Sequence, residues 1–108
     1  MLMVDDVAPC EPTCPVSRAA KVLDGKWTTL IFRELLRGTR RYSQLQRGLE
    51  GISPRMLALR LTALEAEGLI SKTIYPTVPP KTEYALTAQG RRIEPVIAAM
   101  ATFGEHLA

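Results

Sequence analysis

The sequence predicts a mainly helical fold with a small β-hairpin, and three observations support this. Two short helical patterns lie on either side of a turn over residues 51–54. Two strand patterns with a proline-rich loop between them follow over residues 69–86, and longer helical patterns flank this central region. Helix, tight turn, helix and two-stranded ribbon form the layout of a winged helix-turn-helix, whose second helix fits the DNA major groove.

The composition is that of an ordinary globular domain. The chain has 108 residues, of which 46% are hydrophobic, so we expect one domain with a modest core. It contains no run of about 18 apolar residues, and its first residues lack the basic start and apolar stretch of a secretory signal. We therefore expect a cytoplasmic protein, with a flexible tail over residues 1–13 and the DNA-binding domain over residues 14–108.

Positive charge is concentrated in the middle third of the sequence. The net charge is +3, but residues 26–60 contain eight basic and two acidic side chains, which gives 8 − 2 = +6. The first thirteen residues contain three acidic side chains and no basic one. A basic block on the predicted helix-turn-helix fits phosphate binding, and a solvated charged surface is the alternative.

Proline and glycine mark the first two predicted helices. Pro15 suits the first turn of a helix that runs to about Asp24, because the N–H that proline lacks is not needed there. Gly25 ends this helix. The next helix, over residues 26–37, is apolar on nearly all sides, which predicts a central and buried position.

Capping signals define the helix-turn-helix. Ser43 and Gln46 form a capping-box pattern, which predicts a short helix from Ser43 to about Leu49. Ser53 predicts the cap of a fourth helix, with Pro54 in its first turn. The spacing i, i+4, i+7 predicts the buried face of this helix at Leu57, Leu61 and Leu64.

The wing is predicted from two alternating segments. Residues 69–75 and 81–86 read as strands, with Tyr84 and Leu86 on one face of the second. The segment Pro76–Pro80 contains three prolines and cannot form a two-residue hairpin turn, so we expect an extended, stiff loop.

The last predicted helix, from Thr87 as its cap to about Leu107, carries a long apolar stripe. Pro95 predicts a kink or a delayed start within it. Twenty residues span about 30 Å, which is longer than a domain of this size can cover. We therefore expect the same helix of a second subunit to cover the stripe in a twofold dimer. The stripe consists of Ile93, Val96, Ile97, Met100 and Phe103.

The outward face of the fourth helix carries the candidate base contacts. Arg55 either binds guanine through two hydrogen bonds or meets only a phosphate, and Met56 and Leu59 either contact thymine methyl groups or pack internally. Phosphate contacts are expected from the start of the third helix and from the wing, whose base Lys72 and Lys81 flank. The expected DNA-contacting residues are Arg40, Arg41, Ser43, Gln44, Ser53, Arg55, Met56, Leu59, Arg60, Lys72 and Lys81.

Some of these residues have competing structural roles. Lys72 and Lys81 also serve the solubility of the strands. Arg60, like Arg33, points nearer the core, where pairing with an acidic side chain competes with DNA contact. The acidic candidates are Glu34 and Glu65.

The two cysteines, Cys10 and Cys14, are four residues apart. The single histidine, His106, lies near the far end, so a structural zinc site lacks ligands, and no cofactor is expected. Cys14 precedes Pro15 and is predicted at the N-cap of the first helix, where the helix dipole stabilises a thiolate suited to redox or electrophile sensing. An inert cysteine at a dimer interface is the alternative. A disulfide within one chain and one between subunits both fit the sequence.

Short blocks of sequence follow one another in register from about Cys14 to Glu105. They include Cys14–Val16, Gly25–Thr28, Arg33–Gly38, Arg41–Leu45, Gly51–Leu57, Gly68–Ile70, Val78–Lys81 and Leu86–Gly90. These blocks resemble the HxlR-type winged-helix transcriptional regulators of bacteria and archaea.

The resemblance implies a homodimer built from the first and last helices, which binds inverted-repeat DNA as a repressor or an activator. It also places Cys14 at the family's N-terminal cysteine position, which several members use to sense electrophiles or oxidants. Cys10 is not part of the pattern. The dipeptide Ala58-Leu59 departs from the family, in which polar residues are usual there, and this indicates a different operator.

The predicted function is a DNA-binding transcriptional regulator controlled through Cys14. One alternative is the same regulator switched by a noncovalent small-molecule ligand at the dimer interface. Another is a winged helix that serves only as a protein-interaction module. An enzyme is not expected, because the sequence has no nucleophile–base set, carboxylate pair or phosphate loop.

Overall fold

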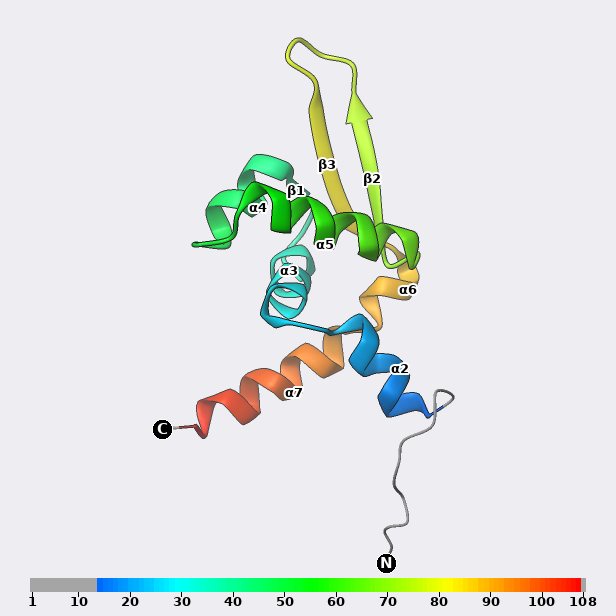
Figure 1. Cartoon of the computed structure of the whole chain (residues 1–108), viewed down its shortest axis with the longest axis vertical. Helices are drawn as coiled ribbons and strands as arrows, with labels where there is room; N and C mark the ends of the chain where they lie inside the picture. Colours follow the sequence, from blue (N-terminus) through cyan, green and yellow to red (C-terminus); the bar gives the residue numbers. More distant parts are fainter. Residues whose placement is uncertain (1–13, 108) are drawn as a thin grey trace, which may run out of the picture.

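The computed structural model describes residues 14–107, so the tail expected over residues 1–13 lies outside the described residues. The described part is mainly helical with one small antiparallel sheet, as the sequence predicts (Figure 1). The elements are α2 (Pro15–Val22), α3 (Lys26–Leu36), β1 (Arg40–Arg41), α4 (Tyr42–Gly48), α5 (Pro54–Ala66), β2 (Ile70–Tyr75), β3 (Lys81–Leu86), α6 (Ala88–Arg91) and α7 (Glu94–Glu105).

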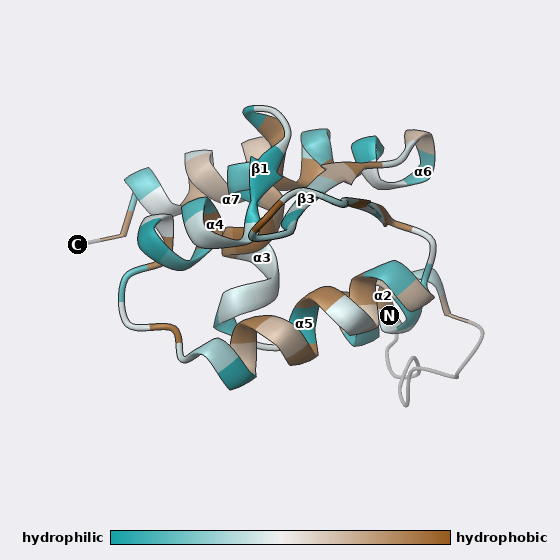
Figure 2. Cartoon of the chain, turned by 90° about the horizontal axis from the view of Figure 1, so that it is seen from above, coloured by the Kyte–Doolittle hydropathy of each residue, from teal (hydrophilic) through white to brown (hydrophobic). Residues whose placement is uncertain are grey.

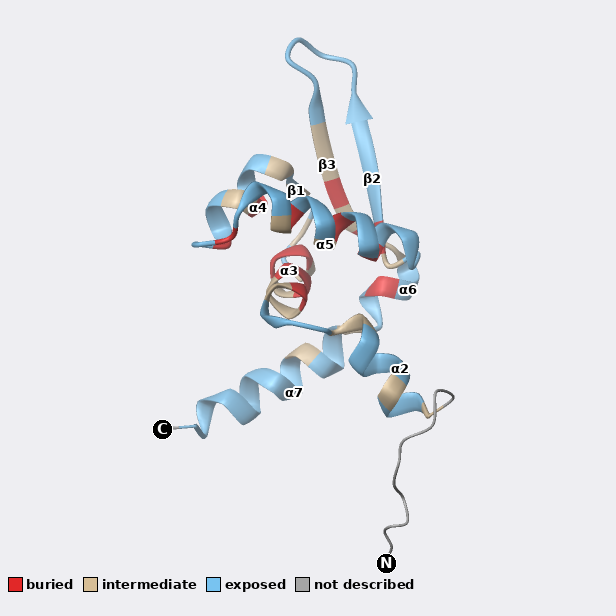
Figure 3. Ribbon diagram, viewed as in Figure 1, coloured by how far each residue is buried: buried red, intermediate tan, exposed pale blue. Residues whose placement is uncertain are grey.

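Helix α3 forms the centre of the hydrophobic core. Its Ile31, Phe32 and Leu35 side chains are at most 1% exposed, which confirms the predicted central position. Apolar side chains from α4, α5, the intervening turn and the sheet complete the core, and burial is concentrated around α3 and the lower part of β3 (Figure 3). They are Leu45, Leu49, Ile52, Leu57, Leu61, Leu64, Ile70, Tyr84 and Leu86.

The start of α5 agrees with its prediction. The Ser53 hydroxyl oxygen accepts a hydrogen bond from the Met56 N–H at 3.0 Å, and Pro54 occupies the first turn. The three leucines at i, i+4 and i+7 are at most 3% exposed, which confirms the predicted buried face. One face of α5 is therefore anchored in the core, and the opposite face lies in solvent.

The predicted capping box of the preceding helix is wrong. Helix α4 begins at Tyr42, and the Gln44 side chain accepts a hydrogen bond from the Arg41 N–H at 2.8 Å. The Gln46 amide instead donates to the Ile52 carbonyl at 2.6 Å. The cap lies two residues earlier than predicted because β1 holds the backbone extended as far as Arg41, and the helix begins directly after it.

The sheet has three strands rather than the predicted two, in the order β1-β3-β2. Strand β1 pairs with β3, so that Arg40 lies opposite Tyr84 and Arg41 lies opposite Glu83. Two consecutive arginines show no alternation of polar and apolar residues, so periodicity gives no sign of this strand. The hairpin β2–β3 has the predicted bounds to within one residue, and Tyr84 and Leu86 are buried as predicted.

The single C-terminal helix that the sequence predicts is divided into two. Helix α6 ends at Arg91, and α7 starts at Glu94 with Pro95 in its first turn, which is the delayed start expected from the proline. The Thr87 hydroxyl caps α6 by accepting a hydrogen bond from the Gly90 N–H at 3.0 Å. Helix α7 extends away from the rest of the described chain and has no buried residue (Figures 1 and 3).

None of the helices within residues 14–107 has the length and apolar character needed to cross a membrane.

Candidate nucleic-acid interface

Two side-chain hydrogen bonds fix the angle between α4 and α5. The Tyr42 hydroxyl, at the start of α4, donates to the Pro54 carbonyl at the start of α5 at 2.9 Å. The Gln46 amide donates to the Ile52 carbonyl in the turn between the helices. The turn also contains Gly51, whose φ of 93° lies in the region that favours glycine. These contacts hold α5 in a fixed orientation, and the positioning roles of Tyr42 and Gln46 were not predicted from the sequence.

The exposed face of α5 brings together two of the predicted base-contacting residues. Arg55 and Leu59 line one shallow hollow on this face, and Leu59 is 55% exposed although it is apolar. The remaining lining is small or weakly polar: Ala58, Thr62, Ala63 and Ala66. Seen from above, α5 lies along one edge of the molecule, with hydrophobic segments among hydrophilic ones (Figure 2).

Met56 and Arg60 are placed differently from Arg55 and Leu59. Met56 is only half-buried and packs against the hydrophobic core. Arg60 is turned toward α2 and α3, where it lines a small cleft with Val22 and Thr28, and its guanidinium group lies beside Gly25. The structure therefore does not bring Arg60 to the face that carries Arg55.

A second groove joins the start of α4 to the wing. Arg41, Ser43 and Lys81 line it together with Tyr42, Pro80 and Thr82. Two cationic side chains and a hydroxyl thus converge from segments that are about forty residues apart in the sequence. Arg40 and Gln44 are not part of this groove: Arg40 donates to the Thr39 carbonyl at 3.1 Å, and the Gln44 side chain caps α4.

Lys72 and Lys81 do not flank the base of the wing together, contrary to the prediction. Lys81 lies opposite Tyr75 at the loop end of the hairpin, and Lys72 lies opposite Tyr84. Because side chains alternate between the faces of a sheet, this register puts the two lysines on opposite faces. The register therefore separates the two lysines, and the DNA contact of each stays a prediction.

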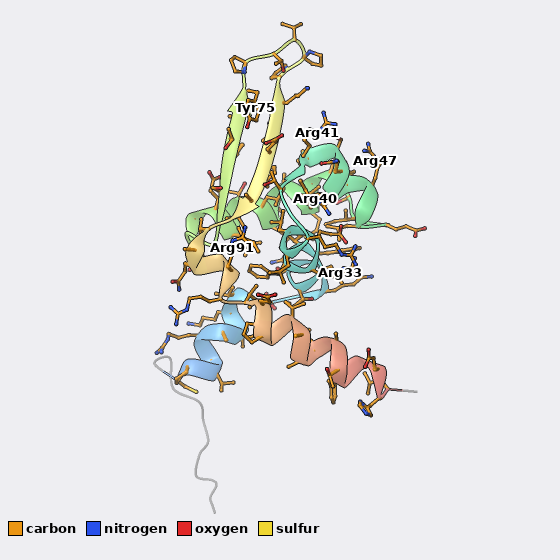
Figure 4. All side chains as sticks on the ribbon, turned by 180° about the vertical axis from the view of Figure 1, so that it is seen from behind. Arg33, Arg40, Arg41, Arg47, Tyr75 and Arg91 are labelled. Atoms are coloured by element: carbon orange, nitrogen blue, oxygen red, sulfur yellow. The ribbon has the colours of Figure 1, made fainter. Side chains whose placement is uncertain are left out.

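Arg47 is an exposed basic residue that the sequence prediction of DNA contacts omitted. It lies at the end of α4, and Figure 4 shows it farther from the wing than Arg41, which lies at the start of the same helix. Its only sequence signal is membership of the basic block between residues 26 and 60. Arg33, by contrast, is held on α3 by an ion pair to Glu34 with a nitrogen–oxygen distance of 3.0 Å.

Two tyrosines of the sheet have perturbed acidity. Burial raises the pKa of Tyr84, and the nearby charge of Glu65 raises it further. On the wing, a hydrogen bond of 3.2 Å from the Tyr75 hydroxyl to the Glu83 carboxylate raises the pKa of Tyr75. Both phenols therefore stay neutral through the physiological range.

Cys14 is the N-cap residue of α2, as predicted, and its carbonyl accepts the first helical hydrogen bond from the Arg18 N–H at 3.0 Å. Its sulfur is in the disulfide state, and the side chain is half-buried. Cys10 lies outside the described residues.

The exposed helix, the basic groove and the wing define a winged helix-turn-helix, a fold typical of DNA-binding transcriptional regulators. The sequence model of the HxlR-like helix-turn-helix family matches residues 22–108. The chain belongs to this family. The match confirms the resemblance seen in the sequence and begins after both cysteines.

Individual relatives agree with this assignment. The chain is 46% identical to the helix-turn-helix-type transcriptional regulator sll1512 of Synechocystis, over 89% of this chain and 73% of that protein. Among solved structures, a regulator of the MarR family from Porphyromonas gingivalis is 41% identical with a TM-score of 0.87, covering 91% of this chain and 96% of that one. The redox regulator HypR in its oxidised form is 39% identical with a TM-score of 0.82, covering 88% of this chain and 98% of its own.

Proposed function

We propose that this protein is a homodimeric regulator that acts in the cytoplasm, binds inverted-repeat operators and responds to oxidants or electrophiles through Cys14. The observation that carries the proposal is the apolar surface of the two terminal helices. Neither α2 nor α7 has a buried residue in the single chain. Val16 is 74% exposed on α2, and Met100 and Phe103 are 44% and 67% exposed on α7.

This exposure supports dimerisation because soluble proteins rarely leave a contiguous apolar face in water. Pro95, Val96, Ala99, Met100 and Phe103 line one almost wholly apolar surface along α7. A second copy of the same helix offers a matching apolar surface, and a twofold axis closes such an assembly. Two recognition helices related by that axis then read two half-sites in opposite orientations.

The dimer and the operator are tested together. The mass of the protein in solution is measured by light scattering for the parent and for Phe103→Glu. We expect a dimer for the parent and a monomer for the variant, since a charge on the apolar face opposes burial. Val78→Glu is the matched control, because Val78 is fully exposed on the wing loop, far along the chain from α7.

The operator is tested with DNA duplexes that the protein selects from a random-sequence pool. We expect the selected duplexes to contain an inverted repeat, and a duplex with a single half-site should bind far more weakly. Affinity should fall roughly a thousandfold or more between 50 and 200 mM salt if six or more phosphates are contacted. A monomeric parent that binds single half-sites tightly would contradict the proposal.

The position of Cys14 supports redox control. Cys14 caps α2, and three residues of that helix, Pro15, Ala19 and Val22, line a hollow shared with Ile93 and Val96 near the start of α7. A change in the bonding of Cys14 thus acts on a helix that shares this hollow with the start of the proposed dimer helix. The likeness to the redox regulator HypR supports the same idea.

The redox arm compares DNA affinity in dithiothreitol and in diamide. We expect a change of about 5- to 150-fold in the parent, which is the usual range of coupling between two sites, and none in Cys14→Ser. Cys10→Ser, followed on a non-reducing gel, separates a disulfide within the chain from one between subunits. A full response in Cys14→Ser would exclude sensing through this residue.

A noncovalent ligand is a second candidate for the switch, and the hollow between α2 and α7 favours it. Its lining is mainly apolar, with Gln89 and Arg92 as polar groups, as in many small-molecule sites. Filling it by Ala19→Trp should abolish the response to such a ligand and leave a response through Cys14 intact. If Ala19→Trp keeps both responses, the hollow is not the binding site of the ligand.

A further inference from the structure

We propose that Leu59 reads the C5 methyl group of a thymine, about two base pairs from a guanine that is bound by Arg55. The inference rests on the proposed DNA-binding function and concerns its specificity. According to this inference, an apolar side chain of α5, and not a hydrogen-bonding one, determines the preference for one base.

The first support is the exposure of Leu59. It is 55% exposed on the face of α5 that points away from the core, and it is not among the side chains that pack against the core. Its neighbours in the shallow hollow are Arg55, Thr62 and three alanines, and the leucine stays more than half exposed beside them. The helix has its own buried leucines for packing, and Leu59 is not needed there.

The second support is the chemistry of the major groove. Base edges present hydrogen-bond acceptors, hydrogen-bond donors and one apolar group, the C5 methyl of thymine. A leucine pressed against a donor or an acceptor deprives that group of water without replacing its hydrogen bond, which is unfavourable. Leu59 therefore favours thymine and opposes the other three bases at the same position.

The third support is the position of Arg55 relative to Leu59. The two residues are one helical turn apart and line the same hollow, so they are separated by about 6 Å along the helix axis. Successive base pairs are about 3.4 Å apart. A helix lying along the groove therefore puts the guanine and the thymine about two base pairs apart.

Charge identifies duplex DNA as the occupant of this apolar face. Arg55 lies on the face itself, and Arg41 and Lys81 line the groove between α4 and the wing. Arg47 is exposed at the end of α4. Cations around an apolar strip match phosphates around base edges, whereas an apolar protein partner would leave these charges without counterions.

The test removes or adds a single methyl group in the DNA. Each thymine of a duplex selected from a random pool is replaced, one at a time, by uracil, which lacks only the C5 methyl. One position per half-site should lose about fourfold in affinity, the value of burying one methyl-sized group. At that position, 5-methylcytosine should bind about fourfold more tightly than cytosine, because the methyl lies in the same place.

The protein variant assigns the effect to its side chain. Leu59→Ala should bind thymine and uracil duplexes equally, and circular dichroism checks that the exposed substitution leaves the fold unchanged. Ile74→Ala is the control, since Ile74 is also a large exposed apolar residue but lies on the wing strand β2. Its ratio of thymine to uracil affinity should equal that of the parent.

Three results would overturn the inference. If the parent protein binds every uracil duplex as tightly as the original thymine duplex, Leu59 does not read a methyl group, although specific DNA binding remains. A uracil penalty that persists in Leu59→Ala would assign the contact to another residue. If the protein selects no duplex from the random-sequence pool, the proposed function is refuted together with this inference.

Discussion

Substitution of Gly90 by alanine separates two physical effects that have opposite signs. Alanine is the better helix former by about 1 kcal/mol, so helix propensity alone predicts stabilisation at this position in α6. The structure predicts the reverse. A Cβ at Gly90 would collide with the carbonyl oxygen of Leu69 and lie 2.9 Å from its carbonyl carbon. Both atoms belong to the backbone, so no side-chain rotation relieves the collision.

The cost follows from what must move. Helix α6 is held to the start of the hairpin by the Thr87 N–H, which donates to the Leu69 carbonyl at 3.1 Å, and by the Thr87 hydroxyl, which donates to the Gly68 carbonyl at 2.7 Å. Displacing α6 weakens both hydrogen bonds, each worth about 1 kcal/mol. Overpacking adds about 1–3 kcal/mol. After the gain in propensity, we expect Gly90→Ala to lower the free energy of unfolding by about 2–4 kcal/mol.

Urea unfolding followed by circular dichroism measures this effect. The midpoint should fall by about 1–2 M for a chain of this size. All variants are compared at one protein concentration, because association stabilises the folded state. Gly104→Ala is the matched control: apart from its chain neighbours and the backbone of its own helix, no atom lies within 4 Å of its added Cβ, so propensity should raise stability by up to about 1 kcal/mol. A Gly90→Ala protein as stable as the parent would refute the argument from close backbone approach.

Three further predictions concern the site and the sheet. Ser53→Ala removes the cap of α5 and should cost about 0.5–2 kcal/mol in urea unfolding, because the Met56 N–H loses its acceptor; an unchanged midpoint would argue against the cap. Arg41→Ala and Arg47→Ala should each reduce the salt dependence of DNA affinity by about one unit of slope while leaving sequence preference unchanged; a changed preference would indicate base contact instead. The raised pKa of Tyr84 means that the folded state favours the neutral phenol, so its contribution to stability is complete below about pH 10 and is lost as the pH rises further. Tyr84→Phe should weaken this alkaline loss, and an identical alkaline profile in the variant would assign it to other groups.

The local elements of this fold are largely predictable because their signals are local. Ser53, Pro54 and the three leucines of α5 specify its cap and its buried face through contacts within about one turn of the chain. The alternation around Tyr84 specifies β3 in the same way. The capping box at Ser43 was wrong because the start of α4 depends on β1, and β1 exists only through pairing with residues about forty positions later in the sequence.

The candidate site was predicted as a set of residue types but not as an arrangement. The sequence identified Arg55 and Leu59 from helical geometry, and the structure puts both in one hollow. The sequence did not show that Arg60 lies apart from Arg55 and Leu59. The direction of its long side chain, beside Gly25, depends on how α2 and α3 pack. The register of the hairpin likewise decides that Lys72 and Lys81 lie on opposite faces.

The sequence by itself determined the order of the elements, the buried face of α5, the basic middle third and, through its sequence blocks, the family. These properties depend on residue identity and on spacing within one turn or one strand. Only the tertiary structure decided which cations converge on the groove between α4 and the wing, that Tyr42 fixes the start of α5, and that Gly90 must lack a side chain. Each of these depends on a contact between segments distant in sequence, whose distance is set by packing around α3 and not by local residue preference.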